Sequence, residues 1–344
     1  MDVLTLLAGL ALLVIGGELV VDHGVRVAQF FKVSPLIIGL TIIAIGTSLP
    51  ELAVGIDGMR KGVGDIVLGN MAGTDVVNVL LILGLSALIR PLAVPNGVIK
   101  RDLPMMTLSS VIFLVLAWNG FLARWEGAAL LIGGLAYMVF TIKTARRGLK
   151  NKGNIDETST DKNYAAHHPE KIKEKVTRKG ALLSGVLMAI GLATIIYGAD
   201  LMLRGAVAIA SDLGVSETLI GLTVIAIGTS APELVTTIIA TIKDERGLAF
   251  GNLVGSSTLN LTIILGAALL FSPIPVPVDP KLIFFSIPFM VLVGVACIPV
   301  FITGKQITRI EGGLFVVAYL VYLGLTIALA QGYVPLPAFV QAGF

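Results

Sequence analysis

The sequence is poor in charge. Only 14% of its 344 residues are Asp, Glu, Lys or Arg, whereas soluble domains carry about 25%; 56% are hydrophobic and the mean hydropathy is +0.93. So few charges cannot cover the surface of a water-soluble chain of this length. The composition therefore predicts an all-α polytopic membrane protein, whose first partner is the lipid bilayer.

Cysteine and histidine are also scarce, which narrows the chemistry. The single cysteine, Cys297, excludes an intramolecular disulfide and lies in an apolar run, where we expect it to serve packing. The three histidines form no pair at helical spacing, and there is no Asp-rich metal motif and no nucleophile with an adjacent base. We therefore predict no enzyme activity, no cofactor, no nucleic-acid partner and no obligate protein partner.

Long apolar runs fill most of the chain. The first, Val3 to Val21, has no basic segment before it and no small-residue cleavage site, so we interpret it as a retained helix and not as a signal peptide. Because a span needs about 20 apolar residues, the sequence predicts about ten transmembrane helices. They are expected near 3–22, 33–59, 64–89, 102–119, 125–143, 180–203, 214–242, 247–271, 282–302 and 311–331.

One stretch occurs twice. Residues 39–84 recur as 221–266 at a constant offset of 182, with 21 of 46 positions identical. The shared positions are mainly Gly, Pro, Glu, Asn, Ser and Thr, whereas a repeat kept only for apolar packing would share Leu, Ile and Val. The repeat therefore indicates a duplicated functional unit.

A polar, basic connector, 144–179, divides the chain into halves of five predicted helices each, 1–143 and 180–344. An odd number of helices per half turns the second half over, which predicts an inverted repeat. The positive-inside rule then predicts a cytoplasmic connector and external termini. Outside the connector, nine Lys and Arg residues fall on its side of the membrane and five on the other: Arg26, Lys32, Arg90, Lys100, Arg101, Lys243, Arg246, Lys305 and Arg309 against Arg60, Lys61, Arg124, Arg204 and Lys281.

Each repeat holds the sequence Gly-Thr-Ser-x-Pro-Glu inside an apolar span. Pro50 and Pro232 lack the N–H that would bond the carbonyl four residues earlier, so we expect free carbonyls at Gly46 and Gly228 and a broken helix. The acid that follows, Glu51 or Glu233, lies near the middle of the span. A carboxylate there costs at least about 2.5–3.5 kcal/mol on insertion scales and marks a functional site.

The neighbouring side chains of each repeat supply oxygen. Thr47 and Ser48 share a helix face with Glu51, and three polar residues step by four along the next helix. Carboxylate, hydroxyl, amide and carbonyl oxygens suit hard cations such as Na⁺ and Ca²⁺. The full set is Thr47, Ser48, Glu51, Asn70, Thr74 and Asn78, with Thr229, Ser230, Glu233, Asn252, Ser256 and Asn260 in the second copy.

The paired motifs, Gly-Thr-Ser-x-Pro-Glu and Gly-Asn-x-x-Gly-[Ser/Thr]-x-x-x-Asn, resemble the two alpha repeats of the cation/calcium exchanger superfamily, and specifically its prokaryotic sodium/calcium exchanger branch. The resemblance implies a core of four helices and a sliding gate formed by the first and sixth helices. It also implies that calcium and sodium share Glu51 and Glu233. The further ligands that it implies are Thr47, Ser48, Thr229, Ser230, Thr74, Ser256, Asn78, Asn260 and the carbonyls of Ala44 and Ala226.

Two positions depart from that family pattern. Many members carry Asp where this chain has Asn260, and Asn where this chain has Asp75. Without an acid at position 260, the two glutamates neutralise one Ca²⁺ but leave an excess positive charge on three Na⁺. We hypothesise that Asp75 supplies the third negative charge; the alternative is that it faces a neighbouring helix or an aqueous rim.

We expect a secondary antiporter that exchanges Na⁺ for Ca²⁺ in a prokaryotic plasma membrane. Two alternatives use the same scaffold: a H⁺-coupled Ca²⁺ antiporter and an exchanger of another cation. A passive channel is a third, but paired inverted broken helices favour alternating access.

Overall fold

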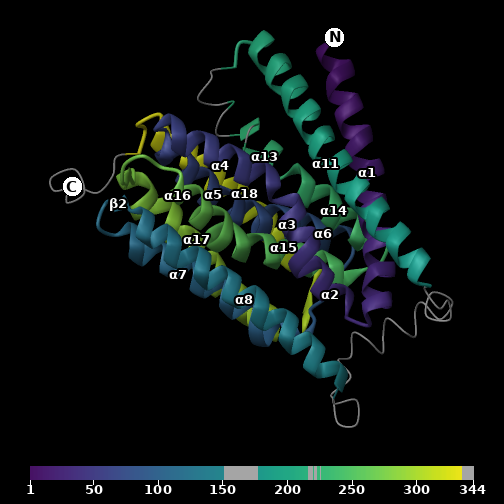
Figure 1. Ribbon diagram of the computed structural model, residues 1–344. Helices are drawn as coiled ribbons and strands as arrows, with labels where there is room; N and C mark the ends of the chain where they lie inside the picture. The colour runs from purple at the N-terminus through teal and green to yellow at the C-terminus, as the bar shows by residue number, and fades with distance from the viewer. Residues whose placement is uncertain (151–176, 216–219, 221–222, 225, 335–344) are drawn as a thin grey trace.

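The computed structural model describes residues 1–150, 177–215, 220, 223–224 and 226–334, and these residues are mainly helical (Figure 1). In the N-terminal half, π-helical turns (η) interrupt several of the α-helices. The elements are α1 (Asp2–Phe31), α2 (Pro35–Ile38), η1 (Gly39–Ile43), α3 (Ala44–Thr47), α4 (Leu49–Lys61), α5 (Gly64–Val76), η2 (Val77–Ile82), α6 (Leu83–Ile89), η3 (Val98–Asp102), α7 (Leu103–Ala117) and α8 (Arg124–Lys150).

The C-terminal half repeats this order. Its elements are α11 (Arg178–Asp212), α13 (Ala226–Thr229), α14 (Ala231–Ile242), α15 (Arg246–Leu259), η5 (Asn260–Ile264), α16 (Leu265–Leu270), η6 (Leu282–Ser286), α17 (Ile287–Ile302) and α18 (Arg309–Ala330). Parts of two predicted segments, the connector 144–179 and the span 214–242, lie outside the described residues, as does the start of the second repeat.

The structure is that of a multi-pass helical membrane protein. Within the described residues, seven helices are long and apolar enough to cross a membrane, and the bent pair Pro35–Thr47 and Leu49–Lys61 makes an eighth. Two predicted spans, 102–119 and 214–242, correspond to shorter helices there: α7 has 15 residues and α14 has 12.

The first and sixth predicted helices run further than expected. The sequence predicts ends at residues 22 and 203, where charges begin, but α1 continues to Phe31 and α11 to Asp212. The charges are accommodated on the helix surfaces. Lys243 pairs with Asp22 at 2.8 Å, and Arg204 pairs with Asp200 at 2.9 Å one turn away. An acid whose charge is paired need not end a helix.

Both predicted helix breaks fall at the serine of the motif. The first span bends by 42° between α3 and α4. Ser48 has φ −87° and ψ 5°, and Ser230 has φ −85° and ψ 6°, so the two copies break in the same way. At the first break the Ser48 N–H bonds to the Ala44 carbonyl at 3.2 Å, and Pro50 has no N–H to bond the Gly46 carbonyl four residues earlier.

Glycine contacts join the helices in matching pairs. Gly9 of α1 meets the backbone of Gly198 in α11, and Gly16 meets that of Gly191. A Cβ on Gly9 or Gly16 would lie 2.7 Å from the facing carbonyl oxygen, so only glycine permits this approach. Adding 182 to Gly9 gives Gly191, and subtracting 182 from Gly198 gives Gly16, so the repeat offset makes the two contacts equivalent. In Figure 1, α1 and α11 run side by side along one edge of the molecule, away from α7 and α8.

The same pairing recurs elsewhere. Gly84 of α6 meets Gly312 of α18, and Gly266 of α16 meets Gly127 of α8. Two short antiparallel ladders repeat the pattern in the loops, where β1 (Leu92–Ala93) pairs with β4 (Gln306–Ile307) and β2 (Phe121–Leu122) with β3 (Val276–Pro277). Each contact therefore joins one half of the chain to the other.

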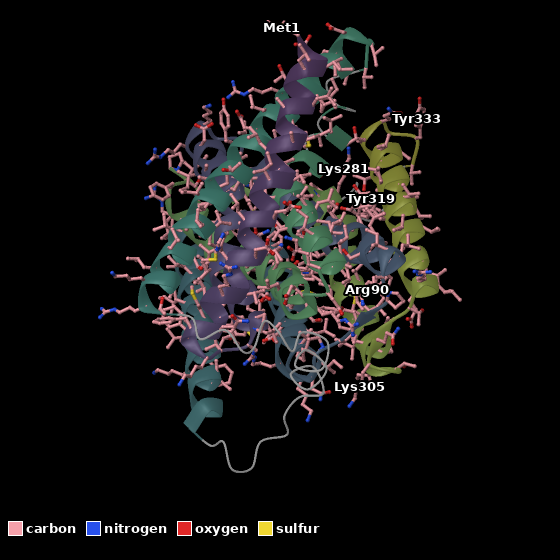
Figure 2. All side chains as sticks on the ribbon, turned by 90° about the vertical axis from the view of Figure 1, so that its right-hand side faces the viewer. Met1, Arg90, Lys281, Lys305, Tyr319 and Tyr333 are labelled. Carbon is pink, nitrogen blue, oxygen red and sulfur yellow. The ribbon has the colours of Figure 1, made fainter. Side chains whose placement is uncertain are left out.

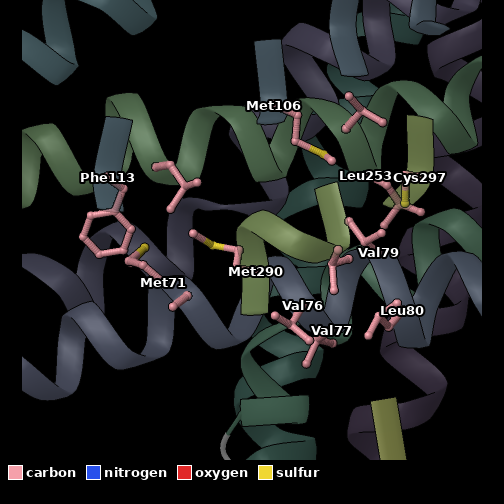
Figure 3. Close-up of a cluster of buried hydrophobic side chains, with 14 of the residues drawn as sticks. Met71, Val76, Val77, Val79, Leu80, Met106, Phe113, Leu253, Met290 and Cys297 are labelled. Carbon is pink, nitrogen blue, oxygen red and sulfur yellow. The ribbon is translucent and has the colours of Figure 1, made fainter. Parts of the chain in front are cut away.

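The apolar core lies between α5, η2, α7, α15 and α17 (Figure 3). Met71, Met106 and Met290 meet there, and Cys297 is buried in the same cluster, in the packing role that the sequence predicts. Met side chains fill irregular gaps between helices well. This core surrounds the two helices that carry Asn78 and Asn260 and fixes their positions.

The molecule has two ends, which we name the connector face and the terminal face. Arg90 and Lys305 mark the connector face, where α8 ends and α11 begins, whereas Met1 and Tyr333 mark the terminal face (Figure 2). Lys281 also lies toward the terminal face. The helices α1 and α11 therefore begin at opposite ends of the molecule.

The glycine contact between α6 and α18 predicts a stability difference. A Cβ on Gly84 would lie 2.9 Å from the Gly312 carbonyl, so Gly84→Ala should destabilise the protein by about 1–3 kcal/mol. Gly324 of α18 has no neighbour within 4 Å, and Gly324→Ala should leave stability unchanged or raise it through helix propensity. Thermal unfolding of the purified variants in detergent measures both, and equal melting temperatures would contradict the packing argument.

Candidate ion-binding site

The two repeat glutamates meet at the centre of the molecule. Glu51 lies in the first turn of α4 and Glu233 in the first turn of α14, because each follows a helix break at Ser48 or Ser230. Both side chains are 0% exposed, and they lie close enough for their charges to repel. The positive ends of two helix dipoles point at the pair and partly offset that repulsion.

Few protein groups satisfy these carboxylates. Ser48 donates a long hydrogen bond to Glu233 Oε1 at 3.4 Å, while Glu233 Oε2 and both oxygens of Glu51 accept none. In the part of the chain that the structure describes, no lysine, arginine or histidine forms an ion pair with either acid. Two buried carboxylates of this kind need a cation, or protons, from solution.

A second layer of polar side chains surrounds the pair. Thr47 donates to Asn252 Oδ1 at 3.1 Å and lies 3.4 Å from the Ser256 hydroxyl. Asn252 Nδ2 in turn donates to Thr237 Oγ1 at 3.1 Å and to the Glu233 carbonyl at 3.4 Å. Asn252 of α15 therefore links Thr47 of the first repeat to α14 of the second repeat. Thr237 is not among the predicted ligands, although its place four residues after Glu233 on one helix face is a signal that could have found it.

Two predicted asparagines stand where the helices change pitch. Asn78 lies in η2 and Asn260 is the first residue of η5, and π-helical turns inside α-helices are frequent at functional sites. Asn78 Nδ2 donates to Ser257 at 3.5 Å, which is the limit of a hydrogen bond. Asn78 Oδ1, Thr74 Oγ1 and both polar atoms of Asn260 have no partner although they are buried. Unsatisfied buried oxygens are available to a dehydrated cation.

The remaining predicted ligands lie at the two breaks. The Ala44 carbonyl accepts the Ser48 N–H at 3.2 Å and faces the Thr47 hydroxyl at 3.4 Å. Thr229 and Ser230 are buried at the second break, and Ala226 opens α13, although its side chain is not described. Hydrogen-bond distances thus join residues of the two repeats directly: Thr47 to Asn252 and Ser256, Ser48 to Glu233, and Asn78 to Ser257.

Asp75 is held away from the glutamate pair. It lies near the end of α5, is only 3% exposed, and has Ser257 beside it. Within the described ranges, no three acidic, histidine or cysteine side chains gather in one place, so Asp75 does not join Glu51 and Glu233 as a third acid of one cluster. It occupies a separate buried position.

The two faces of the site are not equally closed. Six residues of α1 near the connector face are buried, whereas the residues 182 positions later, in the terminal-face part of α11, are only half-buried. The pairs are Val20 and Met202, Val21 and Leu203, Gly24 and Ala206, Val25 and Val207, Val27 and Ile209, and Ala28 and Ala210. Among the described residues, α1 is therefore more deeply buried near the connector face than α11 is near the terminal face.

The two repeat asparagines show the same difference. Asn252, in the connector-face half of α15, is 0% exposed and bonds to three groups. Its counterpart Asn70, in the terminal-face half of α5, is half-buried and its Nδ2 has no partner. The polar contacts that close the site are thus complete on one side only.

A family model described as sodium/calcium exchanger protein matches residues 1–143 and 183–328. The chain belongs to this family. It is a family of membrane transporters and not of enzymes, and the transported ions are the only ligands that its description implies. The connector 144–179 lies wholly outside the matched residues, so the match rests on the two helical halves.

Known relatives extend over most of the chain. The sodium/calcium exchanger MaX1 of Methanosarcina acetivorans is 31% identical over 93% of this chain and 97% of its own length. The inner membrane protein YrbG of Escherichia coli is 34% identical over 78% of this chain and 79% of its length. The solved structure of the sodium/calcium exchanger from Methanococcus jannaschii superposes with a TM-score of 0.77 at 29% identity, covering 94% of this chain and 97% of that one.

The unequal closure of this exchanger predicts unequal thiol reactivity. Because Val25 is 4% exposed and its counterpart Val207 is half-buried, Val207→Cys should react several-fold faster than Val25→Cys with a small cationic thiol reagent. The two variants make the same substitution at equivalent positions, so each is the control for the other. The native Cys297 is 1% exposed and should give little background. Labelling of purified protein without Ca²⁺, followed by mass spectrometry, measures the rates. Equal rates would show that the helix pair is symmetric in solution.

Proposed function

We propose that this protein is a secondary active antiporter that exchanges Na⁺ for Ca²⁺ by alternating access. The observation that carries the proposal is the glutamate pair: two fully buried, mutually repelling carboxylates at paired helix breaks, with three of their four oxygens unbonded. Calcium and sodium are oxygen-seeking ions, and a pair of carboxylates neutralises one Ca²⁺ or two Na⁺.

We assign the roles within the site as follows. Glu51 and Glu233 bind both ions and hold either Ca²⁺ or Na⁺ at one time. The surrounding hydroxyl, amide and carbonyl oxygens complete the coordination and replace water as the ions enter. They are Thr47, Ser48, Thr229, Ser230, Thr74, Ser256, Asn78, Asn260 and the carbonyls of Ala44 and Ala226.

Competition for the glutamates couples the two ions. When the site is empty, two like charges remain in a medium of low dielectric, and closing the protein over them is costly. A bound Ca²⁺ or a set of Na⁺ ions removes that cost, so only the loaded protein changes its open face. We propose that α1 and α11 slide together along the core as the gate, since glycine backbones form their contact.

We further propose ten spans arranged as two inverted halves, 1–143 and 180–344, joined by the connector 144–179. The short helices α7 and α14 complete the count, each as part of a longer membrane-crossing segment. The paired glycine contacts and the two β ladders support a two-fold relation between the halves, because each contact has a counterpart in which the halves exchange roles.

The proposed orientation places the connector face in the cytoplasm of a prokaryotic cell and both termini outside. The basic residues at the ends of the helices support it through the positive-inside rule. The looser packing of α11 then indicates access to the site from outside the cell.

Two exposed lysines test the orientation. Lys281 lies toward the terminal face and Lys305 at the connector face, and both are solvent-exposed. In intact cells an impermeant maleimide should label Lys281→Cys and should leave Lys305→Cys unlabelled until the membrane is permeabilised. The reverse pattern would show that the connector face is outside the cell. Labelling of both cysteine variants in intact cells would show that the two positions do not lie on opposite sides of the membrane.

The transport proposal predicts Na⁺-driven Ca²⁺ uptake. Proteoliposomes loaded with Na⁺ and diluted into Na⁺-free buffer should accumulate ⁴⁵Ca²⁺, whereas Glu51→Gln and Glu233→Gln should each lower the initial rate at least about ten-fold, because one carboxylate cannot neutralise Ca²⁺ alone. Glu18→Gln is the matched control, since Glu18 is exposed on α1 and should leave uptake unchanged.

The same assay separates the alternatives. Uptake driven by a pH gradient without Na⁺ would identify a proton-coupled antiporter. Equilibration of Ca²⁺ without any counter-ion would identify a channel. Absence of Ca²⁺ flux under either gradient, from protein that is folded by its melting temperature, would assign the scaffold to another cation.

A further inference from the structure

Asp75 is a buried acid that the glutamate site leaves unexplained. Its side chain is 3% exposed, neither carboxylate oxygen accepts a hydrogen bond, and no ion pair to it occurs among the residues that the structure describes. A lone carboxylate at this depth is unstable unless something neutralises it. Because Asp75 does not cluster with Glu51 and Glu233, its carboxyl group must be stabilised by its own surroundings, through a cation, hydrogen-bond donors or a proton.

The residues facing Asp75 are related to it by the repeat. The offset of 182 carries Asp75 onto Ser257 and Asn78 onto Asn260. Ser257 lies beside Asp75 and accepts from Asn78 Nδ2 at 3.5 Å. The helix contacts follow the same relation, since η2 packs on α15 and α5 packs on η5. By the repeat offset, Asn260 stands to Asp75 as Asn78 stands to Ser257, but no hydrogen bond joins Asn260 to Asp75.

These four residues, Asp75, Asn78, Ser257 and Asn260, form a polar layer where the two helices cross, and we name them the crossing quartet. Asn78 Oδ1 and both polar atoms of Asn260 have no partner although both residues are 0% exposed. The quartet thus combines one negative charge with amide and hydroxyl oxygens in a position shielded from water. That donor set suits a hard cation of single charge.

We propose that the crossing quartet is a second cation subsite, which binds Na⁺ through Asp75 beside the glutamate site. The proposal rests on the proposed function and adds to it the basis of the ion ratio. The glutamate pair accepts two positive charges as Ca²⁺ or as two Na⁺, and Asp75 accepts one further Na⁺. The Na⁺-loaded protein then carries one more positive charge across the membrane than the Ca²⁺-loaded protein, so exchange moves net charge.

In the Ca²⁺-loaded protein the quartet holds no cation. The Ser257 hydroxyl and the unpartnered amide group of Asn260 are then available as donors to the Asp75 carboxylate, because an amide side chain can present either its oxygen or its nitrogen. The quartet therefore stabilises the Na⁺-loaded protein and still allows the Ca²⁺-loaded protein to change its open face.

The test compares the wild type with Asp75→Asn in proteoliposomes. The variant keeps the shape of the side chain and removes its charge. For the wild type, ⁴⁵Ca²⁺ uptake in exchange for internal Na⁺ should accelerate at an inside-positive potential set with K⁺ and valinomycin. For Asp75→Asn, uptake should become independent of that potential, and the Hill coefficient for internal Na⁺ should fall by about one.

A double variant that exchanges the acid and the hydroxyl tests whether a loss of activity in Asp75→Asn is due to misfolding. The double variant Asp75→Ser with Ser257→Asp moves the acid to the other side of the crossing and keeps the composition of the quartet. It should restore both the voltage dependence and the steeper Na⁺ dependence. If Asp75→Asn is inactive, recovery in the swap supports the subsite and a swap that is also inactive overturns it.

The outcomes separate the two proposals. A wild type without Na⁺-driven Ca²⁺ uptake contradicts the proposed function itself. A wild type that is active and voltage-dependent, beside an Asp75→Asn variant with the same voltage dependence and the same Hill coefficient, overturns the subsite and leaves the exchanger intact. In that case Asp75 is neutral in the protein and serves packing.

Discussion

The structure depends on keeping two carboxylates, Glu51 and Glu233, in a place where water cannot reach them. Each is fully buried and together they repel, so the fold is stable around them only when other features lower the cost. The breaks at Ser48 and Ser230 do part of this by pointing two helix N-termini at the pair. The remainder comes from a cation or from protons, so the site with both carboxylates charged and no cation is the costly state.

Much of this site can be predicted from the sequence, because the chemistry is local. A proline beside a mid-span glutamate is recognisable in one copy, and the second copy at a constant offset shows that the two belong together. Contacts between helices that are distant in the sequence or separated by a turn cannot be predicted in this way. The bond from Asn252 to Thr237, the pairing of Asp22 with Lys243 that lets α1 continue, and the separation of Asp75 from the glutamates all follow from tertiary packing.

A nearly symmetric sequence gives an asymmetric structure. Val25 and Val207 are the same residue at equivalent places in the two halves, yet the first is buried and the second half-buried, and Asn252 is fully bonded where Asn70 is not. The burial of α1 near the connector face and the half-burial of α11 near the terminal face show the same difference along whole helices. In the proposed inverted arrangement of the two halves, the opposite state is available from the same contacts with the halves exchanged. Alternating access is then an exchange of roles between the two halves.

Symmetry also explains why the third acid is single. Glu51 and Glu233 are equivalent residues of the two copies, and in the proposed function they share one ion. Asp75 and its counterpart Ser257 lie side by side at the crossing, so an acid at both positions would place two like charges beside each other in a buried layer. One acid and one hydroxyl avoid that repulsion and leave an odd number of negative charges. In the proposed mechanism Asp75 adds a third negative charge to the two glutamates. This third charge accounts for the net charge that moves across the membrane in each cycle.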